Sequence, residues 1–235
     1  MAVRAVMMQH FLRNTDCEKE PIMGQPKGMF TYANSALVLI DYQPPMFAAI
    51  RSEIPAEVVE LNVRALIRSA KAMDMPVVVS SVGVRSGTNA ATLESIVDEL
   101  PGYQILDRST MNAWEDTAFK DQVVATGRPR LIFAALWTEI CLVYPVISAL
   151  EDGYDAMVVV DAVGGTSQLA HETGIQRLTA AGAAPTTTRA CIDELFRDWR
   201  TPQGAAWRDE ILKPWYLPEL QELSKANPDA RWAVN

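Results

Sequence analysis

The stretch from Leu131 to Ala162 constrains the fold of this 235-residue chain more than any other. It opens with an apolar run, LIFAAL, typical of a parallel strand that is buried on both faces. Apolar residues then recur at helical spacing, namely Leu142, Val143, Val146, Ile147 and Leu150. Gly153 follows where a helix favours a left-handed end, and AMVVVDA has the pattern of another buried strand. The stretch therefore predicts a strand, a sharp turn, a helix and a second strand.

One cysteine, Cys141, lies where the first of these strands passes into the helix, and Thr138 precedes it as a candidate N-cap. A thiol in the first turn of a helix faces the positive end of the helix dipole and several unpaired N–H groups. Both lower its pKa, and the N–H groups can also hold a developing oxyanion. Cys141 is therefore a candidate nucleophile. The alternative is a small buried apolar residue, because free cysteine is among the most buried residue types.

Strands and helices alternate along the rest of the chain. The predicted strands cover residues 35–41, 76–82, 103–106, 131–136, 156–162 and 184–188. This alternation predicts an α/β fold in which helices cover both faces of a mostly parallel sheet. Ligands bind such sheets at the carboxyl ends of the strands. Asp41, Arg108 and Cys141 each lie at or just after such an end, which makes them candidate site residues.

Charge and cysteine content exclude several classes of partner. The formal charge is −8 and the isoelectric point about 4.9, which argues against nucleic acid. The three cysteines, Cys17, Cys141 and Cys191, form no C-x-x-C pair and are odd in number, so a reducing, cytoplasmic setting fits best. No apolar run approaches membrane-spanning length, so we expect no membrane partner.

Common catalytic and cofactor motifs are missing from the sequence. Neither G-x-G-x-x-G nor G-x-x-x-x-G-K-[ST] occurs, and G-x-S-x-G is also absent. The two histidines, His10 and His171, belong to no metal-binding spacing, so we expect neither a metal nor another cofactor. His171 has the pattern of a surface or packing residue on a helix, although a Cys141–His171 dyad stays open as an alternative.

Composition divides the chain into three parts. Residues 1–33 contain a Met-rich start and a lead-in rich in charge, Pro and Gly, and we interpret them as an N-terminal arm. Residues 34–199 carry the alternating pattern. In residues 200–235, Trp and Pro are interleaved, which predicts short helices that pack on the domain or on a neighbouring subunit.

Three motifs, in this order, resemble the isochorismatase-like cysteine hydrolase superfamily. They are SALVLIDYQ followed by F, an arginine-containing loop before NAW, and AALWTEICLVYPVISALEDGYDAMVVVDA. The similarity extends from about Ala36 to Trp199 and is strongest to the YcaC-like branch. It implies a three-layer, Rossmann-like fold with a six-stranded parallel sheet, hydrolase activity on a small molecule and a homo-oligomer.

The resemblance assigns catalytic roles to the three strand-end residues. Cys141, in the T-x-x-C setting that begins at Thr138, matches the nucleophile, and Asp41, in D-x-Q with Gln43, matches the acid/base. Arg108 falls where the family usually has a lysine. Because arginine stays charged, it can orient groups and stabilise negative charge but cannot exchange a proton.

The same resemblance implies the surroundings of the thiol. The family's cis peptide would fall at Trp137–Thr138, and the N–H of Cys141 and one near Thr138 would hold the oxyanion. The metal-binding D-x-H-x-x-x-H of related nicotinamidases is replaced here by SSVGVRSG, which again predicts no catalytic metal. The predicted pocket consists of Gln43, Phe47, Trp114, Trp137 and Ile140.

These residues define a mechanistic hypothesis. Asp41, with its pKa raised by the apolar strand end, takes the proton of Cys141, and the sulfur attacks a carbonyl or related C–N carbon to form a thioester. Two alternatives stay open. Cys141 could be a redox-active thiol in a stress protein, or the pocket could be degenerate in a protein whose role is assembly.

Overall fold

The computed structural model describes residues 28–234, and most of the predicted arm lies outside this range. Six strands form one sheet in the order β3-β2-β1-β4-β5-β6, and every pair is parallel. The strands are β1 (Ser35–Ile40), β2 (Val77–Val82), β3 (Ile105–Arg108), β4 (Arg130–Ala135), β5 (Asp155–Val159) and β6 (Ala184–Thr186). The α/β fold class and the six-stranded sheet predicted from the sequence are thus confirmed.

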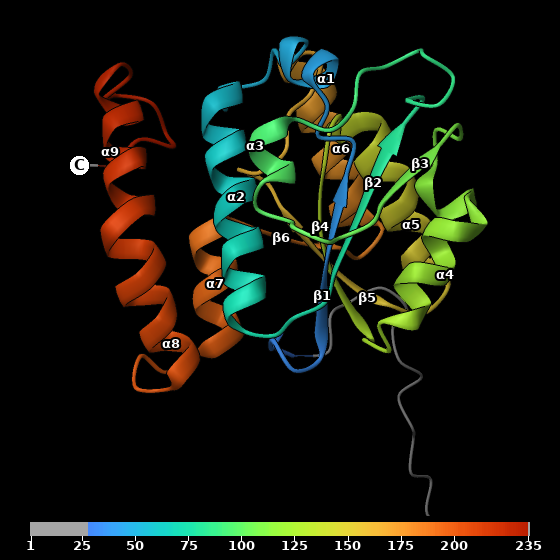
Figure 1. Ribbon diagram of the computed structural model, residues 1–235. Coiled ribbons are helices and arrows are strands. Elements are labelled where there is room, and N and C mark those ends of the chain that lie inside the picture. The colour runs from blue at the N-terminus through green and yellow to red at the C-terminus, as the bar shows by residue number, and fades with distance from the viewer. Residues whose placement is uncertain (1–27, 235) are drawn as a thin grey trace, which may run out of the picture.

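Helices cover both faces of the sheet (Figure 1). On one face lie α2 (Ala56–Ala72) and α7 (Thr188–Phe196), which pack against each other. On the other lie α4 (Thr117–Ala125), α5 (Val143–Glu151) and α6 (Gln168–Ala180). The shorter helical segments are α1 (Pro44–Ala48), α3 (Glu94–Val97), the 3₁₀ turn η1 (Ala113–Glu115) and the π-helical turn η2 (Thr138–Leu142). The core between the layers consists of the apolar strands, which are buried on both faces as predicted.

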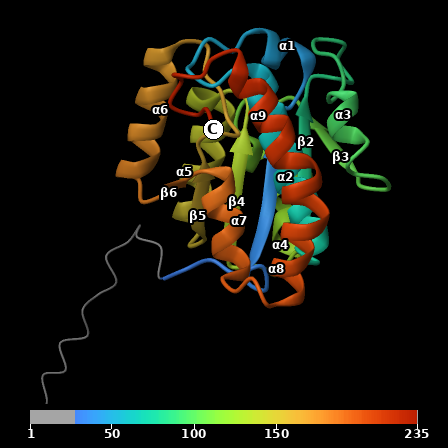
Figure 2. The ribbon, with the colours of Figure 1, turned by 90° about the vertical axis from the view of Figure 1, so that its left-hand side faces the viewer.

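The C-terminal tail forms an additional layer outside α2 and α7 (Figure 2). It comprises α8 (Pro202–Ala206), the π-helical segment η3 (Trp207–Tyr216) and α9 (Leu217–Lys225). Trp207 is fully buried, and the Arg68 guanidinium lies 3.7 Å from the ring centroid of Trp215. The Tyr216 hydroxyl donates to Asn62 Oδ1 of α2 at 2.7 Å. Aromatic anchors thus hold the tail on the domain of its own chain.

The third strand differs from its prediction in a way that matters for the site. The sequence indicated a strand over 103–106 with Arg108 in the following loop, whereas β3 begins at Ile105 and ends at Arg108. Its register pairs Val82 of β2 with Arg108. Arg108 is therefore part of the sheet and only 2% exposed. The predicted strand ended too early because Asp107 and Arg108 are charged, which masked their strand character.

Candidate active site

The sheet brings Asp41, Arg108 and Cys141 together at the carboxyl ends of three strands. β1 pairs with β4 up to Ile40 and Ala135, so Asp41 directly follows the end of the paired segment. This is the point at which the strand order reverses, where α/β sheets bind their ligands. Asp41 has a φ of 63°, and its N–H donates to Ser80 O of β2 at 3.0 Å. The left-handed conformation turns the chain away from the sheet directly after β1.

Asp41 and Arg108 form a buried ion pair. Arg108 Nη2 donates to Asp41 Oδ2, and Arg108 Nη1 donates to the carbonyl of Thr110. The Asp41 side chain is fully buried and that of Arg108 is 1% exposed. Within residues 28–234 no donor bonds to the second carboxylate oxygen, Oδ1. The carboxylate is therefore oriented through one oxygen, and its other oxygen is available to accept a proton.

Burial raises the pKa of Asp41 from 3.8 to about 6, although the nearby Arg108 charge and hydrogen bonding by Cys141 and Arg108 lower it. The direction agrees with the prediction from the apolar strand end. Because this pKa lies close to neutrality, Asp41 is suited to take up and return a proton.

The Cys141 thiol lies beside both members of the ion pair. It is 6% exposed, and burial raises its pKa from 9.0 to about 12, with a further rise from the Asp41 charge. The prediction of a lowered thiol pKa was therefore wrong. Desolvation and a neighbouring carboxylate outweigh both the helix end and the Arg108 charge. At neutral pH the resting pair is a neutral thiol beside a carboxylate.

The turn that carries Cys141 also differs from its prediction. Thr138–Leu142 is a π-helical turn ahead of α5, and Thr138 makes no side-chain cap. Thr138 Oγ1 instead lies 2.9 Å from His171 Nδ1 of α6. The charged groups that act on the pKa of the Cys141 thiol are Asp41 and Arg108, and His171 is not among them. A Cys141–His171 dyad is not formed.

The cis peptide bond joins Leu136 to Trp137, so its predicted place at Trp137–Thr138 was wrong by one residue. The chain turns as it leaves β4, while Leu136 is still bridged to Gly164. The Thr138 N–H then donates to Gly164 O at 2.9 Å and is not available to an oxyanion. The Cys141 N–H and that of a neighbour of Thr138, such as Trp137, stay predicted donors.

Two predicted pocket residues have structural roles. Trp114 Nε1 donates to Asp152 Oδ2 at 2.8 Å, and the ring packs edge-on against Tyr154. Asp152 ends α5, whereas Cys141 precedes its start, so placing Trp114 beside the thiol was wrong. Gln43 Nε2 donates to Val82 O at 3.1 Å and Ala90 O at 2.6 Å, while Oε1 accepts from Val82 N at 3.0 Å. The amide of Gln43 is fully used by the backbone.

The remaining predicted pocket residues lie around the turns at this edge. Phe47 of α1 packs against Tyr42 with ring centroids 5.9 Å apart. Trp137 is partly exposed, and its Nε1 donates to Met46 O at 2.9 Å, which ties the Cys141 turn to α1. Ile140 is partly buried against the core. Contact of these three with a substrate stays a prediction.

Sequence reasoning missed two carboxylates at the same sheet edge. Asp107, next to Arg108, accepts from the Val84 and Arg85 N–H groups and so holds the loop after β2. Asp161, shortly after β5, accepts from the N–H and hydroxyl of Thr188 at the start of α7. The strand-end rule that selected Asp41 would also have selected Asp161 if it had been applied to every strand.

The pKa of Asp41 makes the stability of the protein depend on pH. Because its folded pKa of about 6 exceeds the ordinary value of 3.8, the native state holds a proton that the unfolded chain has released between these pH values. This group's contribution to the free energy of unfolding therefore falls by about 2 kcal/mol as the pH rises from 4 to 7. Asp41→Asn should lack this dependence. Urea unfolding of both proteins at pH 4, 5, 6 and 7 measures the difference, and a pH-independent difference would contradict the assignment.

The three hydrogen bonds of Gln43 predict a structural phenotype. Replacement by Met, which is similar in length but apolar, leaves buried backbone groups of β2 and its loop without partners. We expect the free energy of unfolding to fall by about 2–3 kcal/mol. Gln104→Met, at an exposed position, is the matched control and should change it by less than about 0.5 kcal/mol. A Gln43→Met variant of unchanged stability would show that these three hydrogen bonds do not contribute to the stability of the fold.

Among residues 28–234 there is no group of three acidic, histidine or cysteine side chains that could hold a metal ion, and no helix there is long and apolar enough to span a membrane. A parallel α/β sheet with a buried Cys–Asp–Arg cluster at its switch point defines a candidate active site of an α/β enzyme. Comparison with known proteins gives the family. The isochorismatase domain model matches residues 35–190, and the chain belongs to the isochorismatase family, within its YcaC-like branch.

Relatives of known name support this placement. The chain is 32% identical over 168 residues to the probable hydrolase YcaC of Escherichia coli, covering 71% of this chain and 80% of that protein. The crystal structure of E. coli YcaC, described as an octameric hydrolase of unknown specificity, aligns with a TM-score of 0.75 and 28% identity over 86% of this chain and 99% of that one. YcaC from Pseudomonas aeruginosa, solved with hexane-2,5-diol and covalent acrylamide, aligns with a TM-score of 0.73 and 29% identity over 85% and 98%. The protein is thus a hydrolase of this family.

Proposed function

We propose that the protein is a cysteine hydrolase that cleaves a C–N bond of a small amide or ureide through a thioester on Cys141. The observation that carries this proposal is the buried Asp41–Arg108 pair beside the thiol, with one carboxylate oxygen free of donors. An oriented base of near-neutral pKa next to a neutral thiol is the arrangement that nucleophilic catalysis requires.

Each residue of the cluster has a distinct task in this reaction. Asp41 accepts the Sγ proton as the sulfur attacks the carbonyl carbon, and the Cys141 N–H holds the oxyanion. Asp41 then gives the proton to the leaving nitrogen as the C–N bond breaks. It next takes a proton from water, which attacks the thioester and releases the acid and the thiol. Arg108 keeps Asp41 oriented and stays charged throughout, which is the role open to arginine where the family usually has lysine.

The burial of the thiol distinguishes this proposal from the alternatives. A redox-sensing cysteine needs an accessible thiolate, whereas Cys141 is 6% exposed and its pKa is raised to about 12. A degenerate scaffold would need no donor-free oxygen on a carboxylate beside the thiol, because such a group destabilises the fold without catalytic return. The cluster therefore favours hydrolysis.

We also infer that the protein works as a homo-oligomer in a reducing cytoplasm without a cofactor. Support for assembly comes from its relative, the octameric E. coli YcaC. Both cysteines in the described range, Cys141 and Cys191, are free thiols. In the reducing compartment of a cell they would remain so.

Acrylamide is a direct probe of the proposed nucleophile, since a YcaC relative carries it covalently. Peptide mass spectrometry after acrylamide treatment should find the adduct on Cys141 and none on the fully buried Cys191. Ammonia release from a panel of small amides and ureides, with an acid quench to trap the acyl-enzyme, should then depend on Cys141. Cys141→Ser should abolish both signals, and Cys191→Ala should keep them. An inert Cys141 with no amide turnover would favour the scaffold interpretation instead.

A further inference from the structure

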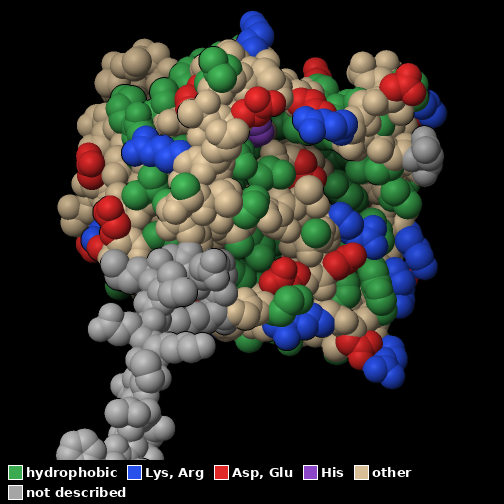
Figure 3. Space-filling view, turned by 180° about the vertical axis from the view of Figure 1, so that it is seen from behind, with side chains coloured by type: hydrophobic (Ala, Val, Ile, Leu, Met, Phe, Trp, Pro, Cys, Tyr) green, Lys and Arg blue, Asp and Glu red, His purple; other side chains and the backbone are tan. Residues whose placement is uncertain are grey.

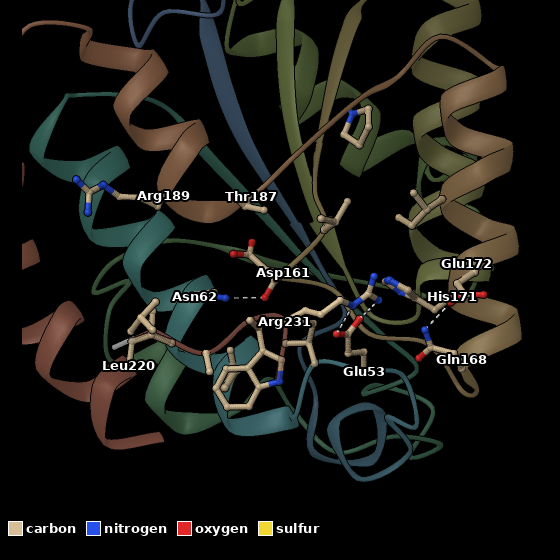
Figure 4. A pocket seen from close by; sticks show the side chains of 18 of the residues that line it. Glu53, Asn62, Asp161, Gln168, His171, Glu172, Thr187, Arg189, Leu220 and Arg231 are labelled. Atoms are coloured by element: carbon tan, nitrogen blue, oxygen red, sulfur yellow. Dashed lines mark hydrogen bonds and ion pairs between the residues drawn. The ribbon is translucent and has the colours of Figure 1, made fainter. Parts of the chain in front are cut away.

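A second cavity lies at the same edge of the sheet, between α6 and the C-terminal tail (Figure 4). Its volume is about 790 Å³, which is within the usual range for small-molecule sites. None of the three residues of the Cys–Asp–Arg cluster lines it. The cavity is therefore separate from the proposed hydrolytic site.

The walls of this cavity are mostly apolar and come from distant parts of the chain. Val58 lies on α2, Ile175 on α6, Leu220 on α9, and Trp232 follows α9. The tail thus supplies one wall and the domain the other. Such a cavity accepts a ligand with an apolar body.

One carboxylate, that of Asp161, points into the cavity from the end of β5 (Figure 4). Its Oδ1 accepts from the N–H and hydroxyl of Thr188 at 2.7 and 2.8 Å. The N–H of Asp161 also bonds its own carboxylate, and no cationic side chain in the described range forms an ion pair with it. Burial raises the pKa of Asp161, so a positive charge brought near it would offset an existing cost.

The cations that line the cavity are already neutralised. Arg231 Nε donates to Glu53 Oε1 at 2.7 Å, and Arg189 pairs with Asp193 of its own helix at 2.7 Å. Arg189 also extends to the far side of the cavity, away from its centre. Glu172, by contrast, accepts only from Gln168 Nε2 among the described residues. The charge of Arg231 also acts on Glu172, so Asp161 is the lining acid without a cationic partner in the described range.

The surroundings of His171 add to this acidic excess. Burial lowers the pKa of His171, which keeps the ring neutral at pH 7, although Glu139, Glu172 and Glu53 act in the opposite direction. In the space-filling view the histidine colour is only partly visible at the surface, with both acidic and basic side chains around it (Figure 3). The polar side of the cavity is complementary to a positive charge.

We propose that this cavity is a second ligand site, which binds an amphipathic organic cation with an ammonium or guanidinium group beside Asp161 and an apolar body against Ile175, Leu220 and Trp232. Indole or phenyl rings on such a ligand would pack on Trp232, and the cation would form an ion pair with the Asp161 carboxylate. This site is independent of the reaction proposed for Cys141.

Calorimetric titration of the full-length protein with tryptamine tests the proposal, and indole-3-propionate serves as the anionic analogue of similar shape. We expect tryptamine to bind at least tenfold more tightly than indole-3-propionate. Asp161→Asn, whose amide oxygen can still accept from Thr188, should weaken tryptamine at least tenfold, and Asp98→Asn, at an exposed position, should not. Ile175→Trp should block binding by filling the cavity, and Cys141→Ser should leave it unchanged.

Three results with tryptamine, its anionic analogue and the cavity variants would overturn the proposal, and a fourth comes from Cys141→Ser. They are no tryptamine binding at millimolar concentration, equal affinity for the anion, and binding that persists in both Asp161→Asn and Ile175→Trp. The cavity-filling variant keeps the test decisive if Asp161→Asn alone fails to fold. Loss of binding in Cys141→Ser would place tryptamine in the hydrolytic site and would also contradict the second site.

Discussion

Asp41→Asn is expected to reduce hydrolysis of the best amide substrate about 10³-fold, because the variant cannot take the proton from Cys141. The fold should persist. Asparagine has the same shape and is among the residues that tolerate the left-handed backbone found here, where φ is 63°. Steady-state kinetics on a folded variant, checked by circular dichroism, measure the effect. Undiminished turnover would remove Asp41 from the mechanism.

The same substitution should make the Cys141 thiol more acidic, although it makes the enzyme less active. In the wild type the Asp41 charge raises the pKa of Cys141, whereas Arg108 lowers it. Without the carboxylate, Arg108 faces the sulfur alone, so alkylation of Cys141 by iodoacetamide should begin at lower pH in Asp41→Asn. A less active enzyme with a more acidic thiol would identify Asp41 as a proton acceptor.

A matched control for this pair of results is Asp107→Asn. Asp107 is adjacent to Arg108 but, because side chains alternate along β3, it faces the loop after β2 instead. It should change turnover by less than tenfold and leave the titration of Cys141 nearly unchanged. If Asp107→Asn behaved like Asp41→Asn, general loss of negative charge at this edge would explain both.

Arg108→Met is expected to lower the free energy of unfolding by about 3–5 kcal/mol near pH 7, because it leaves the Asp41 carboxylate buried without its cation. Lowering the pH should reduce this loss, since a protonated Asp41 needs no partner. Urea unfolding at pH 5 and pH 7.5 measures both effects.

The double variant Asp41→Asn/Arg108→Met is the control for this prediction. It removes both charges, so its stability should exceed that of Arg108→Met. Arg108→Lys keeps the charge but loses the forked contact to Asp41 and Thr110, and it should recover only part of the stability. If the single and double variants lost equal stability, the loss would come from packing of the arginine stem and not from an unpaired charge.

The sheet was predictable because most of its strands are short, continuous apolar runs, which are typical of parallel strands buried on both faces. LIFAAL and SALVLI carry almost no polar residue, and both lie at the centre of the sheet as β4 and β1. The edge strand β3, with the sequence ILDR, is half charged, so its last two residues, Asp107 and Arg108, were assigned to a loop. The packing of the tail on the domain could not be predicted from local sequence patterns. It depends on contacts between residues far apart in the chain, such as that of Tyr216 with Asn62.

The three residues of the site could be predicted from the sequence, whereas the pKa of the thiol could not. Parallel strands end at one edge, so Asp41, Arg108 and Cys141 could be placed together before any coordinates. The thiol pKa could not, because its sign depends on how desolvation, a carboxylate and a guanidinium balance in three dimensions. Trp114 was misplaced for a similar reason, since its partner Asp152 lies 38 residues away.

The segment between β5 and α6 carries two glycines, Gly164 and Gly165, and neither position leaves space for a methyl group. A Cβ on Gly164 would lie 2.9 Å from Ile50 Cγ1, and one on Gly165 would lie 2.8 Å from His171 Cβ. Neither glycine touches the reacting atoms, yet Gly164 O holds the Thr138 N–H in the turn before Cys141. A saturation mutagenesis screen should therefore mark both positions as intolerant, for steric reasons that inspection of the catalytic groups alone would not reveal.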